Sequence, residues 1–130
     1  MRLVSWNCRG LGNPSKAEAV KDILKIEPSH ILMLQETKIE GKALLDIRKK
    51  KWKKSIGRAV SSRGSSGGLA TLWTEDLFQL NKSHEAQRWI YTELTHCTNK
   101  LTISLFNLYV LVLYSEKKDC WNSLFEFLEQ

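Results

Sequence analysis

A short apolar segment that ends in polar side chains, residues 31–38, defines the class of fold to which this chain belongs. Its sequence is ILML followed by QETK. An apolar run of this length, bounded by polar residues, is typical of a strand that is covered on both faces. Alternation along a strand predicts that Leu32, Leu34 and Glu36 share one face. Glu36 then has two interpretations: a surface carboxylate beyond the strand, or a ligand at a strand's carboxyl end, where α/β folds bind their substrates.

The neighbouring segments indicate an α/β arrangement. Residues 2–6 predict a first strand. A capping box formed by Ser15 and Glu18 predicts the start of an amphipathic helix that ends before Pro28, and a second helix is predicted at residues 41–51. Strand, helix and strand joined by short loops are typical of the beginning of an α/β domain.

The second half of the chain predicts antiparallel strands and a final helix. Strands that follow a serine- and glycine-rich loop at residues 60–68 are expected at residues 69–73, 77–80, 89–94 and 101–109. The final helix, residues 115–130, has Trp121, Leu124, Phe125 and Leu128 as one apolar stripe. We therefore expect the 130 residues to form one α/β domain with mixed and antiparallel sheets and flanking helices.

Charge favours an anionic partner such as nucleic acid, because the net charge is +6. The cations that surround Trp52 are Arg48, Lys49, Lys50, Lys51, Lys53 and Lys54. One interpretation is a nucleic-acid-binding segment in which lysines contact phosphates and the indole stacks or packs. The other is a solvated helix face with a buried Trp52 anchor.

Three cysteines without metal-ligand or disulfide spacing indicate neither a zinc site nor a disulfide-linked partner. Cys8 has no identifiable base beside it, so we expect a structural thiol. No signal peptide and no apolar segment long enough to span a bilayer is present in the sequence, which favours an intracellular protein without membrane contact.

Polar side chains end three of the predicted strands. Asn7 follows the first strand, Gln35 and Glu36 follow the second, and Asn107 and Tyr109 end the last. If these ends converge, they bring together one carboxylate, amide groups and a phenol. This set suits a hard cation such as Mg²⁺ and a phosphoryl oxygen, and it does not suit zinc.

Five segments carry a family resemblance through their order and spacing: SWNCRGLGNP at 5–14, LQETK at 34–38, SSGGLATLW at 65–73, FNLY at 106–109 and SEKKDCWNSL at 115–124. Together they resemble the endonuclease/exonuclease/phosphatase superfamily, and within it the apurinic/apyrimidinic-type endonuclease domain of plant LINE (non-LTR) retrotransposons. The resemblance implies a four-layer α/β sandwich, of which residues 1–130 form a partial domain that lacks its C-terminal half.

The resemblance also implies residue roles. Glu36 is similar to the family's metal-binding glutamate, with Gln35 in support. Asn7, Tyr109 and Asn107 are similar to catalytic residues: Asn7 contacts the phosphate and the metal-water network, Tyr109 bonds the scissile phosphate, and Asn107 supports Tyr109. The implied cofactor is Mg²⁺ (or Mn²⁺), the implied substrate is DNA rather than RNA, and a nuclear location is consistent with the family.

Two departures from the family pattern set the expected activity. Leu111 stands where the family has a proline, and the family's later GDFN-like and aspartate–histidine segments have no counterpart. We therefore expect an N-terminal fragment of a Mg²⁺-dependent DNA endonuclease domain of retrotransposon origin that is inactive alone. The alternatives are a non-catalytic, basic nucleic-acid-binding remnant and a superfamily phosphoesterase with a substrate other than nucleic acid.

Overall fold

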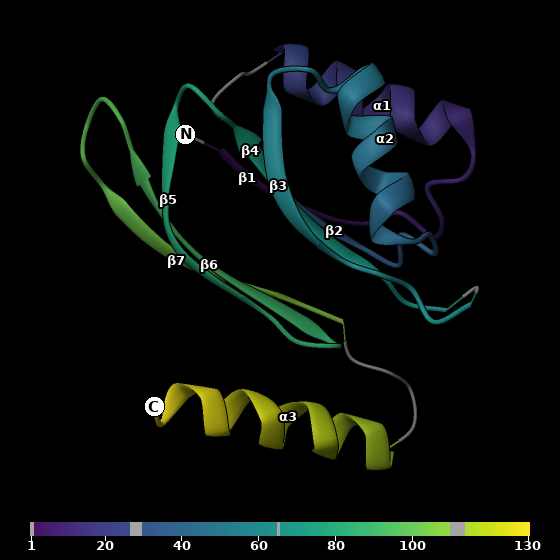
Figure 1. The fold of residues 1–130 in the computed structure, drawn as a ribbon, viewed down its shortest axis with the longest axis vertical. Coiled ribbons are helices and arrows are strands. Elements are labelled where there is room, and N and C mark those ends of the chain that lie inside the picture. Colours follow the sequence, from purple (N-terminus) through teal and green to yellow (C-terminus); the bar gives the residue numbers. More distant parts are fainter. Residues whose placement is uncertain (1, 27–29, 65, 110–113) are drawn as a thin grey trace.

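Four layers make up the chain, as seen in a computed structural model that describes residues 2–26, 30–64, 66–109 and 114–130 (Figure 1). Helices α1 (Pro14–Ile26) and α2 (Gly41–Lys51) form the first layer. Two sheets form the middle layers, and α3 (Tyr114–Leu128) covers the far side of the second sheet. The predicted mixture of α and β structure in a layered sandwich is confirmed.

The first sheet carries the carboxyl ends that matter for function. Its strands are β1 (Arg2–Asn7), β2 (His30–Gln35), β3 (Ser55–Val60) and β4 (Leu69–Thr74), in the order β1-β2-β4-β3. Strands β1 and β2 are parallel, whereas β4 runs antiparallel to both β2 and β3. Because Asn7 pairs with Gln35, the two parallel strands end side by side.

The second sheet is antiparallel throughout. It contains β5 (Phe78–Glu85), β6 (Trp89–His96) and β7 (Thr102–Leu108) in that order. Strand β5 continues five residues beyond the predicted end at Leu80, through a register shift between Leu80 and Lys82. A bulge of this kind breaks the alternation by which a strand is predicted from sequence.

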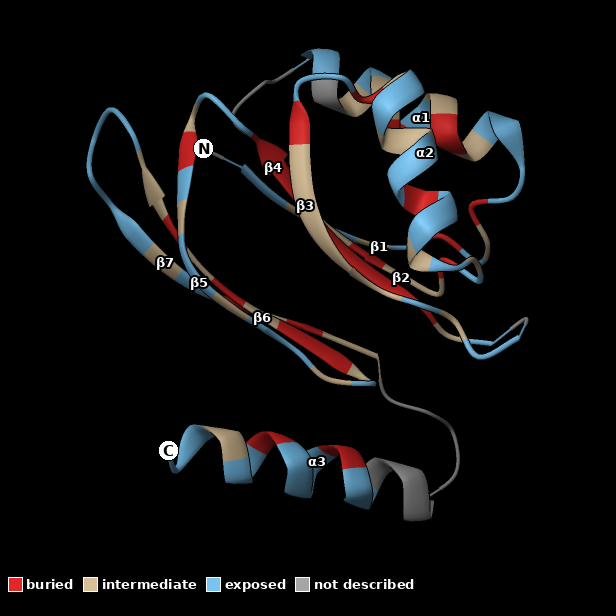
Figure 2. Cartoon of the chain, viewed as in Figure 1, coloured by how far each residue is buried: buried red, intermediate tan, exposed pale blue. Residues whose placement is uncertain are grey.

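Buried residues occur on the strands of both sheets and on all three helices (Figure 2). Leu32 and Leu34 of β2 pack toward α1 and α2, and Ile31 packs toward the second sheet. Strand β2 is therefore covered on both faces, as its apolar sequence predicts. Trp73, Phe78, Leu94 and Leu105 complete the core between the sheets. Trp89, Cys120 and Leu124 fill the space beneath α3.

Strand β3 was not predicted, and Val60 belongs to it rather than to the following loop. Its sequence SIGRAV has a glycine near the middle, which weakens a strand pattern. The structure explains Gly57: a Cβ there would lie 2.2 Å from the carbonyl oxygen of Thr71 on β4. Close approach of the two strands therefore requires a glycine.

The start of α1 also differs from prediction. Ser15 does not cap the helix; instead Oδ1 of Asn13 accepts hydrogen bonds from the Ser15 amide at 3.0 Å and the Ser15 hydroxyl at 2.8 Å. Asn13 is the cap and Pro14 is the first helical residue, a favoured position for proline. Glu18 makes an ion pair with Lys51 of α2 instead of completing a capping box.

The predicted apolar stripe of α3 is wrong in part. Leu124 is buried, but Trp121, Phe125 and Leu128 are 40%, 54% and 58% exposed. The side that faces the second sheet carries Cys120, Leu124 and Phe127 instead, because the Phe127 ring packs against aromatic rings of β6 and β7. None of the helices in the described part of the chain is long and apolar enough to cross a membrane.

Candidate functional site

The loops that follow β1 and β2 hold Asn7 and Glu36 next to each other. Backbone pairing continues past the strand ends: the amide of Cys8 donates to the Gln35 carbonyl at 3.0 Å, and the amide of Gly10 donates to the Glu36 carbonyl at 2.7 Å. Each loop therefore fixes the other. The predicted meeting of these two strand ends is present in the structure.

Glu36 faces the second sheet rather than the helices. Strand β2 ends at Gln35, and Glu36 has a left-handed backbone with φ of 53°, which few side chains adopt without cause. The turn interrupts the alternation that predicted a shared face with Leu32 and Leu34. Oε1 of Glu36 instead accepts a hydrogen bond of 3.0 Å from the hydroxyl of Tyr109, which follows β7.

These contacts keep the Glu36 carboxyl ionised. The hydrogen bond from Tyr109 lowers the pKa of Glu36 below its ordinary value, and a hydrogen bond from Asn7 lowers it further against the opposing effect of desolvation. Lys38 and Arg9 add smaller effects in the same direction. A carboxylate with a lowered pKa is a weak general base but a good ligand for a cation.

Asn107 joins the two sheets behind this carboxylate. Its side chain is 1% exposed, and its Nδ2 group donates to the carbonyl oxygens of Ala70 at 2.9 Å and Leu34 at 3.3 Å. Its Oδ1 atom accepts a hydrogen bond of 2.8 Å from Nε2 of Gln35. A residue this deeply buried does not touch a substrate, so Asn107 positions the strand ends, and Gln35 links it to the site.

A glycine pair supports the Glu36 loop from the other side. The amides of Thr37 and Lys38 donate to the carbonyls of Gly68 at 3.2 Å and Gly67 at 2.8 Å. Both glycines have positive φ, and a Cβ on Gly68 would lie 2.2 Å from Oγ1 of Thr37. Gly67 and Gly68 are therefore part of the frame that fixes Glu36, although the composition of residues 60–68 predicts only a flexible loop.

Cys8 is a structural thiol, as expected. It is 1% exposed, and its Sγ atom contacts the Gln35 carbonyl at 3.2 Å. Burial raises the pKa of the Cys8 thiol above its ordinary value. A thiol that stays protonated is not a nucleophile.

The part of the site formed by described residues supplies only a partial metal site. Across the described ranges no group of three histidine, cysteine, aspartate or glutamate side chains could hold a metal ion. Glu36 offers one carboxylate, and Asn7 offers an amide oxygen that now accepts a hydrogen bond of 3.2 Å from the Arg9 amide. Leu111, the departure at the site rim, lies outside the described residues.

A cavity of about 300 Å³ lies beside Tyr109 and contains two arginines that were not predicted as site residues. Arg63 comes from the loop before β4, and Arg88 comes from the turn before β6. The Arg88 carbonyl accepts a hydrogen bond of 3.0 Å from the Tyr109 amide. Isolated arginines in loops give no sequence pattern, so only their position beside Tyr109 marks them as candidates for contact with phosphate.

The basic segment, residues 48–54, lies at the opposite end of the first sheet from Glu36. At one end of β4, Leu69 pairs with Gln35, the neighbour of Glu36. At the other end, Thr74 pairs with Ser55, which directly follows the basic segment, and the six residues of the strand span about 17 Å. Trp52 is 2% exposed and donates from Nε1 to the Ala17 carbonyl at 3.0 Å. The buried-anchor interpretation of Trp52 is therefore correct, and its indole is not available to stack on a base.

Residues 4–112 match the endonuclease/exonuclease/phosphatase family. The chain belongs to this family. The sequence resemblance at the level of the superfamily is therefore confirmed, and the family is generally dependent on divalent metal ions. A search of curated proteins finds no match.

Solved structures show the same fold. The chain is similar to the AP endonuclease LMAP from Leishmania major, with 19% identity and a TM-score of 0.63 over 84% of this chain and 40% of that one. It is similar to the catalytic domain of Xenopus laevis APE2, with 21% identity and a TM-score of 0.64 over 94% of this chain and 49% of that one. The chain therefore spans less than half the length of these two structures.

Proposed function

We propose that this chain supplies the Glu36 part of a phosphodiester-hydrolysing site of the DNA endonuclease type. The observation that carries the proposal is the pairing of an ionised Glu36 carboxylate with Tyr109 and Asn7, where three strands end in a chain of this family. A retrotransposon origin and a nuclear location are part of the same proposal. Expression of a fluorescent fusion would test the location.

The residues fit part of a Mg²⁺ (or Mn²⁺) site. Glu36 would supply a direct carboxylate ligand and Asn7 would orient a bound water or phosphate, since Mg²⁺ often takes one or two carboxylates and completes its shell with water and phosphate oxygens. A bound ion of this kind would supply charge stabilisation at the phosphoryl oxygens. The Tyr109 hydroxyl, which now donates to Glu36, would donate to a phosphate oxygen in the substrate complex.

We propose that the 130 residues are a partial domain that is catalytically incompetent alone. The described residues bring no group of three histidine, cysteine, aspartate or glutamate side chains together, and the lowered pKa of Glu36 makes it a poor base for activating water. The short span of the chain relative to the two AP endonuclease structures supports the same proposal. Plasmid nicking in Mg²⁺ or Mn²⁺ is expected to stay at background. Nicking that disappears in Glu36→Gln would contradict the proposed incompetence and support an active site.

Metal binding gives a test that does not depend on turnover. In the NMR spectrum of the isolated chain, Mn²⁺ is expected to broaden amide signals near Glu36 and Asn7 first. The broadening should be lost in Glu36→Gln and kept in Glu40→Gln, which changes an exposed carboxylate nearby. Equal broadening in wild type and Glu36→Gln would overturn the assignment of Glu36 as a metal ligand.

The second candidate is non-catalytic binding of nucleic acid, DNA more than RNA, through the basic segment. Lys49, Lys50, Lys53 and Lys54 are exposed, which favours contact with a phosphate backbone. Arg48 is more constrained, because it donates to the Ser55 carbonyl at 2.6 Å. DNA affinity should fall steeply with salt, and each lysine lost should reduce the slope of log K against log salt by about 0.9. An unchanged slope in a variant with Lys49, Lys50 and Lys53 replaced by glutamine would exclude this candidate.

A further inference from the structure

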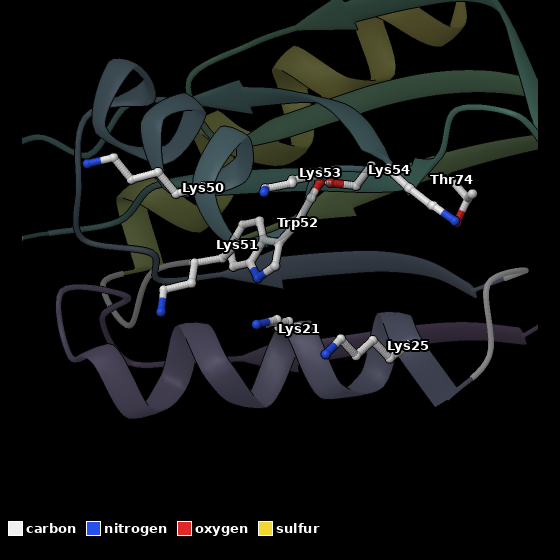
Figure 3. A pocket seen from close by; sticks show the side chains of 9 residues that line it. Lys21, Lys25, Lys50, Lys51, Trp52, Lys53, Lys54 and Thr74 are labelled. Atoms are coloured by element: carbon white, nitrogen blue, oxygen red, sulfur yellow. Dashed lines mark hydrogen bonds between the residues drawn. The ribbon is translucent and has the colours of Figure 1, made fainter.

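A lysine-lined pocket occupies the end of the molecule opposite Glu36. Its volume is about 490 Å³. Its lining consists of Lys21, Lys25, Lys50, Lys51, Trp52, Lys53, Lys54, Ser55 and Thr74 (Figure 3). No carboxylate is among these residues. The pocket brings together cations that are far apart in the sequence, so inspection of residues 48–54 alone does not reveal it.

The pocket has a fixed floor between two groups of lysines. Lys21 and Lys25 lie one turn apart on α1, across the Trp52 indole from the lysines at the end of α2 (Figure 3). The indole is held by its bond to the Ala17 carbonyl, and the Trp52 carbonyl accepts a hydrogen bond of 2.6 Å from the Ser55 hydroxyl. The backbone that carries the cations is therefore anchored in the core.

The positive charge of the pocket is balanced only in part. Lys51 is paired with Glu18, and the charges of Lys21 and Lys25 also help to lower the pKa of the Glu18 carboxyl. Within the described part of the chain, Lys50, Lys53 and Lys54 make no ion pair. Cations stabilise the last turn of a helix, which accounts for Lys25 and Lys50. Lys21 lies three residues after Glu18 on α1 and interacts with its carboxyl. Neither effect accounts for Lys53 and Lys54, which lie beyond the end of α2. These cations line one concave site, and a bound anion would be attracted to them.

We propose that this pocket binds a compact anion that carries two or more phosphate groups. Ammonium groups bind phosphate as point charges, and several of them around a concavity of this size suit a small multivalent ligand. The pocket presents no guanidinium and no exposed ring, so it recognises charge rather than a base or a sugar. The phosphates belong either to a free polyphosphate or to a nucleic-acid strand. The site is independent of Glu36 and of the proposed hydrolytic function, and it shares Lys50, Lys53 and Lys54 with the basic segment of the second candidate function.

Calorimetric titration of the whole chain at physiological salt tests the proposal with two ligands, inorganic tripolyphosphate and a short single-stranded DNA. The pocket variant replaces Lys21, Lys25 and Lys54 with glutamine. A matched variant replaces Lys42, Lys100 and Lys118, which are exposed, lie outside residues 48–54 and do not line the pocket, so both variants lose the same charge. At this salt the screening length is about 8 Å, which separates local contacts from net charge.

At least one ligand is expected to bind the wild-type chain and the matched variant with similar affinity, and to bind the pocket variant about tenfold or more weakly. Tighter binding of tripolyphosphate identifies a free polyphosphate as the source of the phosphates, and tighter binding of DNA identifies a strand. Glu36→Gln should leave the affinity unchanged, which separates this site from the proposed hydrolytic site. Absence of binding by both ligands, or equal weakening in the two variants, would overturn the proposal. Circular dichroism establishes that both variants are folded.

Discussion

Removal of the Asn107 side chain should destabilise the whole chain, because this amide connects the two sheets. The amide group has two N–H bonds for three acceptors: the carbonyls of Ala70 and Leu34 and the hydroxyl of Thr71. With the bond accepted from Gln35, three hydrogen bonds are made at a time. At about 0.5–1.5 kcal/mol each, Asn107→Ala should lower the free energy of unfolding by about 1.5–4.5 kcal/mol.

Urea denaturation followed by tryptophan fluorescence measures this loss. Asn107→Asp is a second variant, which keeps the shape of the side chain but replaces the donor group with an oxygen. That oxygen would face the carbonyls of Leu34 and Ala70, so the variant should lower the free energy of unfolding at neutral pH without creating a cavity. Asn81→Ala is the control, because Asn81 is exposed and bonds only to the Thr95 hydroxyl among the described residues. It should change stability by less than about 0.5 kcal/mol. A similarly small effect in both Asn107 variants would refute the cross-sheet role.

Three further predictions concern the site frame and the core. Gly68→Ala should lower the free energy of unfolding, measured in urea, by about 1–3 kcal/mol, because Gly68 has a positive φ and a new Cβ would contact Thr37. The control is Gly12→Ala, whose Cβ would meet nothing within 4 Å and which should leave the stability nearly unchanged. Tyr109→Phe should raise the pKa of Glu36 in a carboxyl NMR titration. The ionised Glu36 stabilises the fold above its unfolded pKa and loses this effect as pH falls through its lowered folded pKa, so the stability gap between wild type and Tyr109→Phe should narrow in acid. Leu124→Ala should cost about 2–5 kcal/mol, and a near-neutral result would contradict the packing of α3 on the second sheet.

The elements with a strong apolar period could be predicted from sequence, and the others could not. The run ILML specifies a strand buried on both faces, and the structure places it in the middle of the first sheet. Strand β3 was not predicted because it contains Gly57, a residue type that weakens a strand pattern. Gly57 is required by the close approach of β4, and this contact leaves no local pattern in the sequence. The buried side of α3 was misassigned at Trp121 and Phe125, since a helix with apolar residues on two sides does not indicate which side the protein covers.

The position of Glu36 illustrates a different limit. Alternation predicts the wrong face for it, because a positive φ at the residue itself turns the carboxylate toward the second sheet. The convergence of Asn7, Glu36 and Tyr109 was nevertheless predictable, since it depends on where strands end and not on which face a single residue occupies. The supports from Gly68 and Asn107 depend on long-range backbone contacts, which explains why a flexible loop and a catalytic side chain were expected there.

Among the described residues, contacts from several parts of the chain orient Glu36. The loop after β1, the glycine pair before β4 and the end of β7 converge on it from three distant parts of the sequence. If the isolated chain is inactive, as proposed, the arrangement of the described residues attributes the loss to an incomplete set of ligands and bases, and not to misplacement of the Glu36 carboxylate. This distinction has a consequence for complementation: residues that complete the site would meet a Glu36 already in position, so they should restore activity without first reordering its loop. In the NMR spectrum, the amide signal of Glu36 in the isolated chain should already have the chemical shift of a folded loop. A shift from an unfolded value to a folded value when the complementing residues are added would contradict this reasoning.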